Sequence, residues 1–135
     1  MHITLENDWL SVQVKTKGAE LSYVWHRKHA LQYMWSGDAA VWGKTSPVLF
    51  PIVGTLKNNT YVYKGQTYTL PRHGFARDMV FEVFSLAADA VTFRLQSNGQ
   101  TRTNYPFDFT FYIIYTLHQQ TLTVTYRVEN NSGDD

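Results

Sequence analysis

Cysteine is absent from the 135 residues of the chain. Its absence excludes disulfide frameworks, thiolate nucleophiles and cysteine-based metal sites. An excess of charge of one sign is also lacking, since 12 Lys and Arg against 11 Asp and Glu leave a formal net charge of +1. A chain so close to neutral has no field strong enough to attract nucleic acid or an anionic membrane. We therefore expect neither of these as a partner.

Long apolar runs are missing as well. The run from Val48 to Phe50 is typical of the longest ones, and roughly 20 apolar residues are needed to span a bilayer. The first six residues, MHITLE, alternate between apolar and polar instead of placing an apolar block after a basic stretch. We therefore expect no signal peptide, and a cytoplasmic location is the default.

Aromatic residues, in contrast, are abundant. Nine Tyr, eight Phe and four Trp make up 16% of the chain. Such side chains pack well across the strands of a sheet, which explains most of them. Their ring faces also suit a cleft that binds sugar. The length favours one domain with a real hydrophobic core.

A period of two in hydrophobicity runs through most of the sequence and predicts short strands. Ile3 and Leu5 alternate with polar residues, as do residues 10–15, and Asn7 and Asp8 between them are typical of a tight turn. Further strands are expected over residues 19–25, 60–63, 66–70, 79–86, 90–95, 107–117 and 121–128, with an extended crossing or edge strand in residues 44–54 and a short aromatic segment at residues 31–35. About ten short strands predict an all-β fold, an antiparallel sandwich or barrel.

Three segments carry more specific expectations. Residues 36–42 could form one helical turn with Ser36 or Asp38 as its N-cap, the only helix we expect, while residues 96–104 are expected to form a polar loop. Residues 107–117 are apolar on both faces, so we expect that strand to be covered on both sides. Residues 129–135 form a turn sequence, which predicts either a polar tail or the first part of a longer protein.

The segment Pro71–Asp78 concentrates reactive side chains around a glycine. His73 can exchange protons with a hydroxyl or a ring oxygen near neutral pH, although hydrogen bonds at a sheet edge could also explain it. The planar fork of Arg77 suits a phosphate, a carboxylate or neighbouring hydroxyls, unless it pairs with Asp78 or Glu82. Arg72 would point away from His73 in an extended segment, toward the rim of the site or solvent.

Other polar residues are weaker candidates. Lys44, Lys57, Asn58 and Asn59 flank a segment with a proline at each end, Pro47 to Pro51, and could converge on the same cleft or lie in solvated loops. The histidines at 26, 29 and 118 are in turn contexts. No pair of histidines has the spacing of metal ligands together with a carboxylate, so we expect no metal site.

The strings Ser46–Gly54, Tyr61–Gly65 and Pro71–Asp78 together closely resemble the aldose 1-epimerases (galactose mutarotases). The similarity is nearest to the bacterial LacX-like branch and extends to the hexose-6-phosphate 1-epimerases. It covers essentially the whole chain. The resemblance implies a large antiparallel galactose mutarotase-like β-sandwich, with residues 1–135 as the N-terminal part of that single domain.

The resemblance also implies a reaction, the interconversion of α and β anomers of a hexose or hexose phosphate without a cofactor. By resemblance, His73 is the histidine that binds the sugar near its ring oxygen and assists the acid. Arg77 corresponds to an arginine that helps to hold the substrate, and Lys44 lies near a second basic contact. We expect Arg72 to be a further substrate-binding residue. Members of the family are about twice this length, and their principal acid histidine and base glutamate have no counterpart here, since Glu129 is in the wrong context. The fragment alone is therefore expected to be inactive.

Two other interpretations remain open. Trp25, Trp35 and Trp42 could form a stacking platform in a carbohydrate-binding module that turns nothing over. Alternatively, the chain could be a structural all-β subunit with no ligand.

Overall fold

The computed structural model describes residues 1–134 and is almost entirely β-structure. Over these residues it contains ten strands, one α-helix and two 3-10 helices. The elements are β1 (His2–Glu6), β2 (Leu10–Lys15), β3 (Glu20–His26), β4 (Leu31–Gln32), η1 (Lys57–Asn59), β5 (Thr60–Tyr63), β6 (Gln66–Thr69), η2 (Ala76–Asp78), β7 (Glu82–Leu86), β8 (Ala90–Gln96), α1 (Gly99–Asn104), β9 (Phe109–His118) and β10 (Thr121–Asn130).

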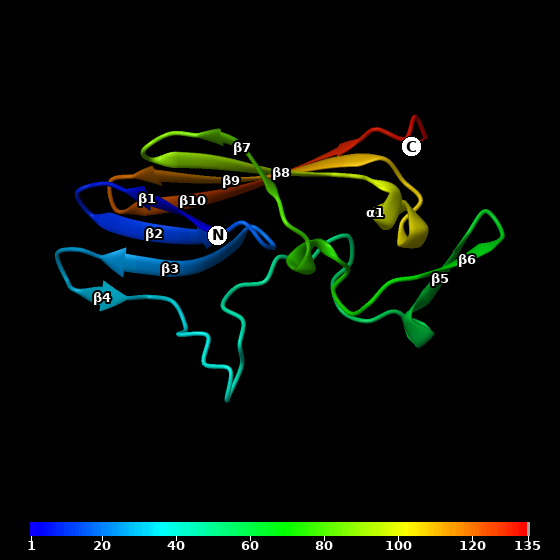
Figure 1. Cartoon of the computed structure of the whole chain (residues 1–135), viewed down its shortest axis with the longest axis horizontal. Helices are drawn as coiled ribbons and strands as arrows, with labels where there is room; N and C mark the ends of the chain where they lie inside the picture. Colours follow the sequence, from blue (N-terminus) through cyan, green and yellow to red (C-terminus); the bar gives the residue numbers. More distant parts are fainter. Residues whose placement is uncertain (135) are drawn as a thin grey trace.

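Two antiparallel four-stranded sheets form the layers of a sandwich (Figure 1). One has the order β1-β2-β3-β4 and the other the order β10-β9-β8-β7, while β5 and β6 form a separate hairpin. The expected all-β antiparallel sandwich is thereby confirmed. No helix in the described part of the chain has the length and apolar character that crossing a membrane requires.

The core lies between the two sheets and follows the alternation of the sequence. Leu5, Val12 and Val14 from one sheet are fully buried, as are Phe93 and Ile113 from the other. Their burial removes apolar surface from water, at about 25 cal/mol per Å², and so stabilises the stacking of the layers. At the first turn, the side-chain oxygen of Asn7 accepts hydrogen bonds of 2.8 Å from the backbone N–H groups of Trp9 and Leu10.

The expected helical turn in residues 36–42 is a single turn that is not continued into a helix, in which Asp38 Oδ1 accepts from Ala40 N and the Asp38 carbonyl from Trp42 N. The expectation that no other helix is present was wrong. The α-helix is α1, within the segment that we expected to be a polar loop. A capping box explains it, since the side chain of Asn98 accepts from Thr101 N while the Thr101 side chain accepts from Asn98 N.

The expectation that β9 is covered on both faces was also wrong. The side chains of Phe111, Ile113 and Tyr115 face the core and are buried, whereas Tyr112 and Ile114 on the other face are only half-buried. The neighbouring strand β10 pairs with β9 on one side and forms the edge of its sheet in the described chain. The inner face is covered at β9, whereas Tyr126 and Val128 on the same side of β10 are exposed at the edge.

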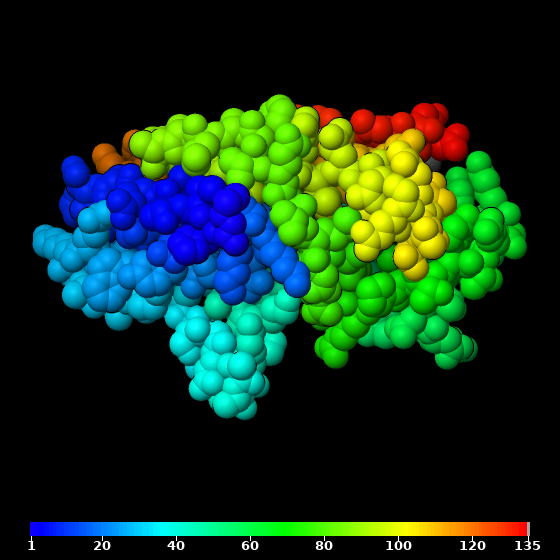
Figure 2. Space-filling view, in the orientation of Figure 1, coloured from blue at the N-terminus to red at the C-terminus, as the bar shows by residue number. Residues whose placement is uncertain are grey.

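A long irregular connection leads from β4 to η1. In the space-filling view, the part near residue 40 projects from the body of the molecule (Figure 2). The segment returns to the sandwich at Thr45 and Ser46, which lie against the start of β3. This connection and the turn before η2 carry most of the candidate site residues.

Candidate active site

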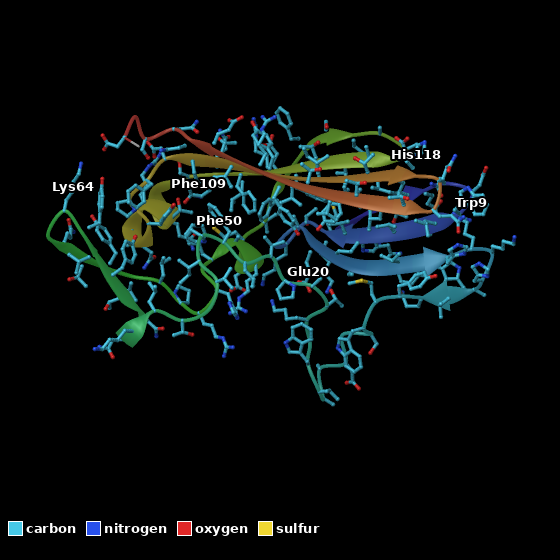
Figure 3. The ribbon with its side chains drawn as sticks, turned by 180° about the vertical axis from the view of Figure 1, so that it is seen from behind. Trp9, Glu20, Phe50, Lys64, Phe109 and His118 are labelled. Carbon is cyan, nitrogen blue, oxygen red and sulfur yellow. The ribbon has the colours of Figure 1, made fainter. Side chains whose placement is uncertain are left out.

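The turn at His73 and Gly74 forms the centre of the site. Both residues have left-handed backbone, with φ of 65° and 74°. A side chain at position 74 would overlap the carbonyl of Phe50, so this close approach requires glycine. The same carbonyl accepts hydrogen bonds from Phe75 N at 3.0 Å and Ala76 N at 3.2 Å. The turn is thus locked against the proline-bracketed segment, and Phe50 in turn packs its ring on Phe109, 5.1 Å away between centroids (Figure 3).

Gly54 holds His73 through two hydrogen bonds, one from the backbone of His73 and one to its imidazole. The N–H of His73 donates to the Gly54 carbonyl at 2.8 Å, and the N–H of Gly54 donates to Nδ1 of His73 at 2.8 Å. A backbone N–H is always a donor, so Nδ1 must be the unprotonated nitrogen. In the neutral ring the proton is therefore on Nε2. The backbone at Gly54 selects this tautomer and leaves Nε2–H free to act as a donor.

Arg72 lies beside that donor. Its Nε is 3.2 Å from Nε2 of His73. Because both nitrogens carry a hydrogen in the tautomer that Gly54 selects, this contact brings two donors together and is not a hydrogen bond. The N–H of Arg72 points at Nε2, so it would have to turn for an oxygen beside the two nitrogens to accept from both.

Arg77 and Lys44 add further positive charge. A terminal nitrogen of Arg77 donates to the Arg72 carbonyl at 3.1 Å, and its Nε lies 3.9 Å from Asp78. Lys44 Nζ lies 3.7 Å from the other oxygen of the same carboxylate. Glu82, the alternative partner that we considered for Arg77, pairs with Arg94 instead. One carboxylate thus faces two cations beside the site.

These side chains border a cavity of about 580 Å³. It has a polar side and an apolar side. The polar side carries Arg72, His73 and Arg77, and the other is formed by Trp42, Pro47 and Leu49. The volume suits a ligand of the size of a hexose, which has polar hydroxyls and apolar C–H faces.

The surroundings of His73 also affect its charge. Desolvation of the ring, followed by the positive charges of Arg72 and Arg77, lowers the pKa of His73 below its ordinary value of 6.5. The neutral ring is therefore favoured, which agrees with the tautomer fixed by Gly54. In this form Nε2–H donates a hydrogen bond, and the ring carries no second proton to transfer.

The structure places the predicted residues unevenly. His73, Arg77 and Arg72 line one cavity, so the expectation that Arg72 points away from His73 was wrong, because the segment is a turn and not an extended strand. Lys44 does not line the cavity but reaches Asp78 next to it. Lys57, Asn58 and Asn59 lie on η1, outside the residues that line it.

Two features were missed. Pro47 and Leu49 belong to the cavity wall, and Glu20, which holds the adjacent Thr45, was not singled out. The glycine-containing string TKGAEL around Glu20 is the signal that could have drawn attention to it. The hydrogen bonds between Glu20 and Thr45 join residues that are 25 positions apart, and hydrophobic periodicity does not reveal such a contact.

The other histidines are away from this cavity. His26 is buried, with 4% of its surface exposed, and its Nε2 lies 3.0 Å from the side-chain oxygen of Gln120. We expected His26 to lie in a turn, but it is the last residue of β3, directly before the turn. Among residues 1–134, no group of three or more His, Asp or Glu side chains is arranged to hold a metal ion.

Comparisons with known proteins give a consistent result. The family description that matches is "Aldose 1-epimerase", over residues 1–135. The plasmid-encoded Protein LacX of Lactococcus lactis subsp. lactis is 34% identical over 135 residues, which cover 96% of this chain and 45% of LacX.

Solved structures agree. A galactose mutarotase related enzyme from Lactobacillus acidophilus is 42% identical with a TM-score of 0.95, over 98% of this chain and 44% of that one. A galactose mutarotase-like protein from Lactobacillus casei ATCC 334 is 34% identical, also with a TM-score of 0.95, over 99% of this chain and 46% of that one. The chain thus spans about half the length of these relatives.

Proposed function

The chain belongs to the aldose 1-epimerase family, and on that basis we propose that it contributes the sugar-binding half of a site that interconverts α and β anomers of a hexose or hexose phosphate. The observation that carries this proposal is the donor pair at the cavity. His73 Nε2–H is fixed by Gly54 and stands 3.2 Å from Arg72 Nε. Two adjacent donors suit an oxygen of a sugar ring.

The reaction requires one proton to leave and another to arrive. A general base removes the proton from the C1 hydroxyl while an acid protonates the ring oxygen, so that the bond between C1 and the ring oxygen breaks and C1 becomes a carbonyl. Rotation about the bond from C1 to C2, followed by the reverse steps, gives the other anomer. In this scheme Nε2–H of His73 donates to the ring oxygen as its negative charge develops.

The cationic groups would hold the sugar in place. Arg77 is half-buried and already anchored through the Arg72 carbonyl, so its remaining N–H groups are oriented toward the cavity with little freedom to lose. Arg72 shares its acceptor with His73. Lys44, beside Asp78, lies close enough to contribute positive charge to a phosphorylated substrate. Trp42 and Leu49 would cover the apolar face of the ring.

We propose that the catalytic pair is incomplete in these 135 residues. The only carboxylate next to the polar side of the cavity in the described chain is Asp78, which pairs with Lys44 and Arg77. The chain also spans about half the length of its relatives. The chain alone should therefore bind sugar and accelerate anomerisation little.

The test combines two measurements on one preparation. Titration with D-galactose, followed by tryptophan fluorescence, should show saturable binding because Trp42 lines the cavity. Polarimetry on freshly dissolved α-D-galactose should show little acceleration by this chain. In a full-length protein that contains these residues, His73→Ala should lower the rate by roughly 10²-fold, the usual effect of removing one fixed donor to a developing negative charge. His118→Ala is the matched control. His118 is the last residue of β9 and lies away from the cavity, so its replacement should leave the rate unchanged.

Either half of the proposal can fail separately. Full activity of the 135 residues would show that the base is already present. An unchanged rate in His73→Ala would remove His73 from the site. The absence of any response to sugar in either assay would favour a structural subunit without a ligand.

One observation favours a second candidate, a carbohydrate-binding module. Trp42 lies on the cavity, and its carbonyl accepts from the indole N–H of Trp35 at 2.9 Å, so two exposed tryptophans form a fixed unit. Trp25 is not part of this unit, since it lies on β3 and stacks near Tyr23. A module would bind sugar in the fluorescence assay, and even a full-length protein would not accelerate anomerisation.

A further inference from the structure

Glu20 is a buried carboxylate that forms no ion pair in the described chain, although Lys15 lies opposite it on β2 and helps to lower its pKa. Only 3% of its surface is exposed, and in the part of the chain that the structure describes no Lys, Arg or His nitrogen lies within salt-bridge distance of it. A buried charge is costly unless hydrogen bonds compensate for it. Glu20 is the first residue of β3, where a polar side chain facing inward has no role in the sheet itself. Its position therefore calls for a specific explanation.

One oxygen of this carboxylate receives three hydrogen bonds from two consecutive residues. Oε1 accepts from Thr45 N at 2.6 Å, from Thr45 Oγ1 at 2.8 Å and from Ser46 N at 3.1 Å. The Leu21 carbonyl adds to the same junction, since it lies 2.8 Å from Thr45 Oγ1 and accepts from Ser46 Oγ at 2.7 Å. Desolvation raises the pKa of Glu20, but the hydrogen bonds from Thr45 and Ser46 outweigh it, so the pKa lies below 4.5 and the carboxylate stays charged.

The residues that Glu20 holds end the segment from residue 34 to residue 47, here called the strap. The strap carries Trp42 and Pro47 on the cavity wall and Lys44 beside Asp78. Most of its other hydrogen bonds are internal, such as those from Trp35 to Trp42 and from Trp42 to Asp38. Figure 3 shows Glu20 at the start of β3, where the strap meets the sandwich. The carboxylate is thus the main tie between this wall and the core.

The same turn also supports the opposite wall. Gly18 donates to the Met79 carbonyl at 2.7 Å, and a side chain at Gly18 would come within 2.7 Å of the Arg77 carbonyl. The carbonyl of Ala19 accepts from the buried hydroxyl of Tyr115 at 2.7 Å, which anchors the turn on β9. Residues 18–20 therefore meet the backbone that carries Arg77 on one side and the strap on the other. The distance between the two cavity walls depends on this turn.

We propose that Glu20 is a positioning residue, which fixes the wall formed by Trp42 and Pro47 at the correct distance from His73 and Arg77. The effect on sugar binding rests on the function proposed above, whereas the effect on the strap does not. Glu20 does not touch the cavity, so it acts only through Thr45 and Ser46. A methyl group in its place would leave the backbone N–H groups of Thr45 and Ser46 without their acceptor, whereas the Thr45 hydroxyl could still donate to the Leu21 carbonyl. The amide of glutamine would keep an acceptor oxygen in the same place, with weaker hydrogen bonds.

The experiment compares Glu20→Ala, Glu20→Gln and the parent chain by amide hydrogen exchange and by D-galactose titration. In Glu20→Ala the amides of Thr45 and Ser46 should exchange at least about tenfold faster, while those of Val12 and Ile113 in the core keep their protection. The affinity for D-galactose should fall by a similar factor because the cavity wall is no longer fixed. Glu20→Gln should restore most of both properties. Glu6→Ala, which removes an exposed carboxylate paired with Arg27, is the control and should change neither.

Unchanged exchange at Thr45 and Ser46 in Glu20→Ala would overturn the proposal. So would faster exchange with undiminished affinity for D-galactose, since the strap would then not position the site. If the core amides of Glu20→Ala also lose their protection from exchange, the variant has unfolded more widely. The proposal is then tested with Glu20→Gln and Thr45→Val, because each weakens the hydrogen bonds of the junction without leaving a cavity. If the parent chain binds no sugar, the function proposed above fails, and the exchange data still decide whether Glu20 holds the strap.

Discussion

In the sandwich, neighbouring side chains support one another, whereas in the candidate site single residues hold whole segments. Phe93, Ile113 and Tyr115 belong to a continuous apolar layer between two sheets, and each strand is paired along its length. The turn at Gly74 and the junction at Glu20 instead depend on a few hydrogen bonds between a side chain or carbonyl and distant backbone. The two regions should therefore respond differently to substitution.

This difference has a functional consequence. A packed layer loses stability in proportion to the volume removed, but it keeps its shape while it remains folded. A site held by single contacts can lose its geometry at a small cost in global stability. Changes in the sandwich should therefore be seen mainly in the free energy of unfolding, and changes in the site mainly in ligand binding and local exchange.

The largest effect is expected for Phe93→Ala in the core. Phe93 is fully buried, so its removal leaves a cavity and should lower the free energy of unfolding by about 3–5 kcal/mol. The control is Phe84→Ala on the outer face, where Arg94 covers a half-exposed ring, and the loss should be about 1 kcal/mol. Urea denaturation followed by circular dichroism measures both. Equal losses would show that the inner face is not the core.

The next largest effect is expected for Gly74→Ala. Gly74 and Gly65 have nearly the same positive φ, 74° and 77°, but only a side chain at 74 meets other atoms, those of Phe50 and Pro51. Gly65→Ala should therefore cost about 1 kcal/mol for its backbone conformation alone, and Gly74→Ala about 3 kcal/mol, since the overlap is added to it. Urea denaturation measures the free energy of unfolding of both variants. The difference between their losses is the cost of the overlap between a side chain at position 74 and Phe50. A difference of zero would mean that the turn can move away from Phe50 freely.

A smaller effect concerns the pH dependence at His73. The fold favours the neutral ring, since its pKa is below 6.5, so the contribution of the bond between His73 and Gly54 to stability is present above pH 6.5. It is lost as the pH falls through the lowered pKa. Arg72→Ala should raise this pKa toward its ordinary value, while Arg27→Ala, far from the ring, should not. An NMR titration of the imidazole measures the shift, and a pKa unaffected by Arg72→Ala would contradict the assigned contact.

The sandwich could be predicted from the sequence because its causes are periodic. Alternation at residues 2–6 and 10–15 fixes which face is buried, and the glycine after Lys64 supplies the positive φ of the hairpin between β5 and β6. Periodicity was insufficient for β9, since apolar residues on both faces do not reveal that only one face is covered. It also missed α1, where the cause is the local capping box of Asn98 and not an apolar face.

The site was predictable in composition but not in geometry. The unusual string around His73 identified the centre, and the resemblance supplied roles for Arg77 and Lys44. The sequence could not show that residues 71–74 turn sharply, which brings Arg72 onto the same cavity as His73. Nor could it show that Glu20 reaches Thr45, because that contact depends on how β3 meets a long irregular segment. A local sequence pattern does not reveal contacts between residues far apart in the chain, because the whole fold determines them.

The central claim is that His73 presents a fixed Nε2–H donor to a sugar oxygen. Long-range proton–nitrogen NMR of the imidazole, with and without D-galactose, tests it directly. We predict an unprotonated Nδ1, a protonated Nε2, and a change in the Nε2 resonance when D-galactose is added, with His118 unaffected. A proton on Nδ1, or galactose binding that leaves the His73 resonances unchanged, would contradict the account.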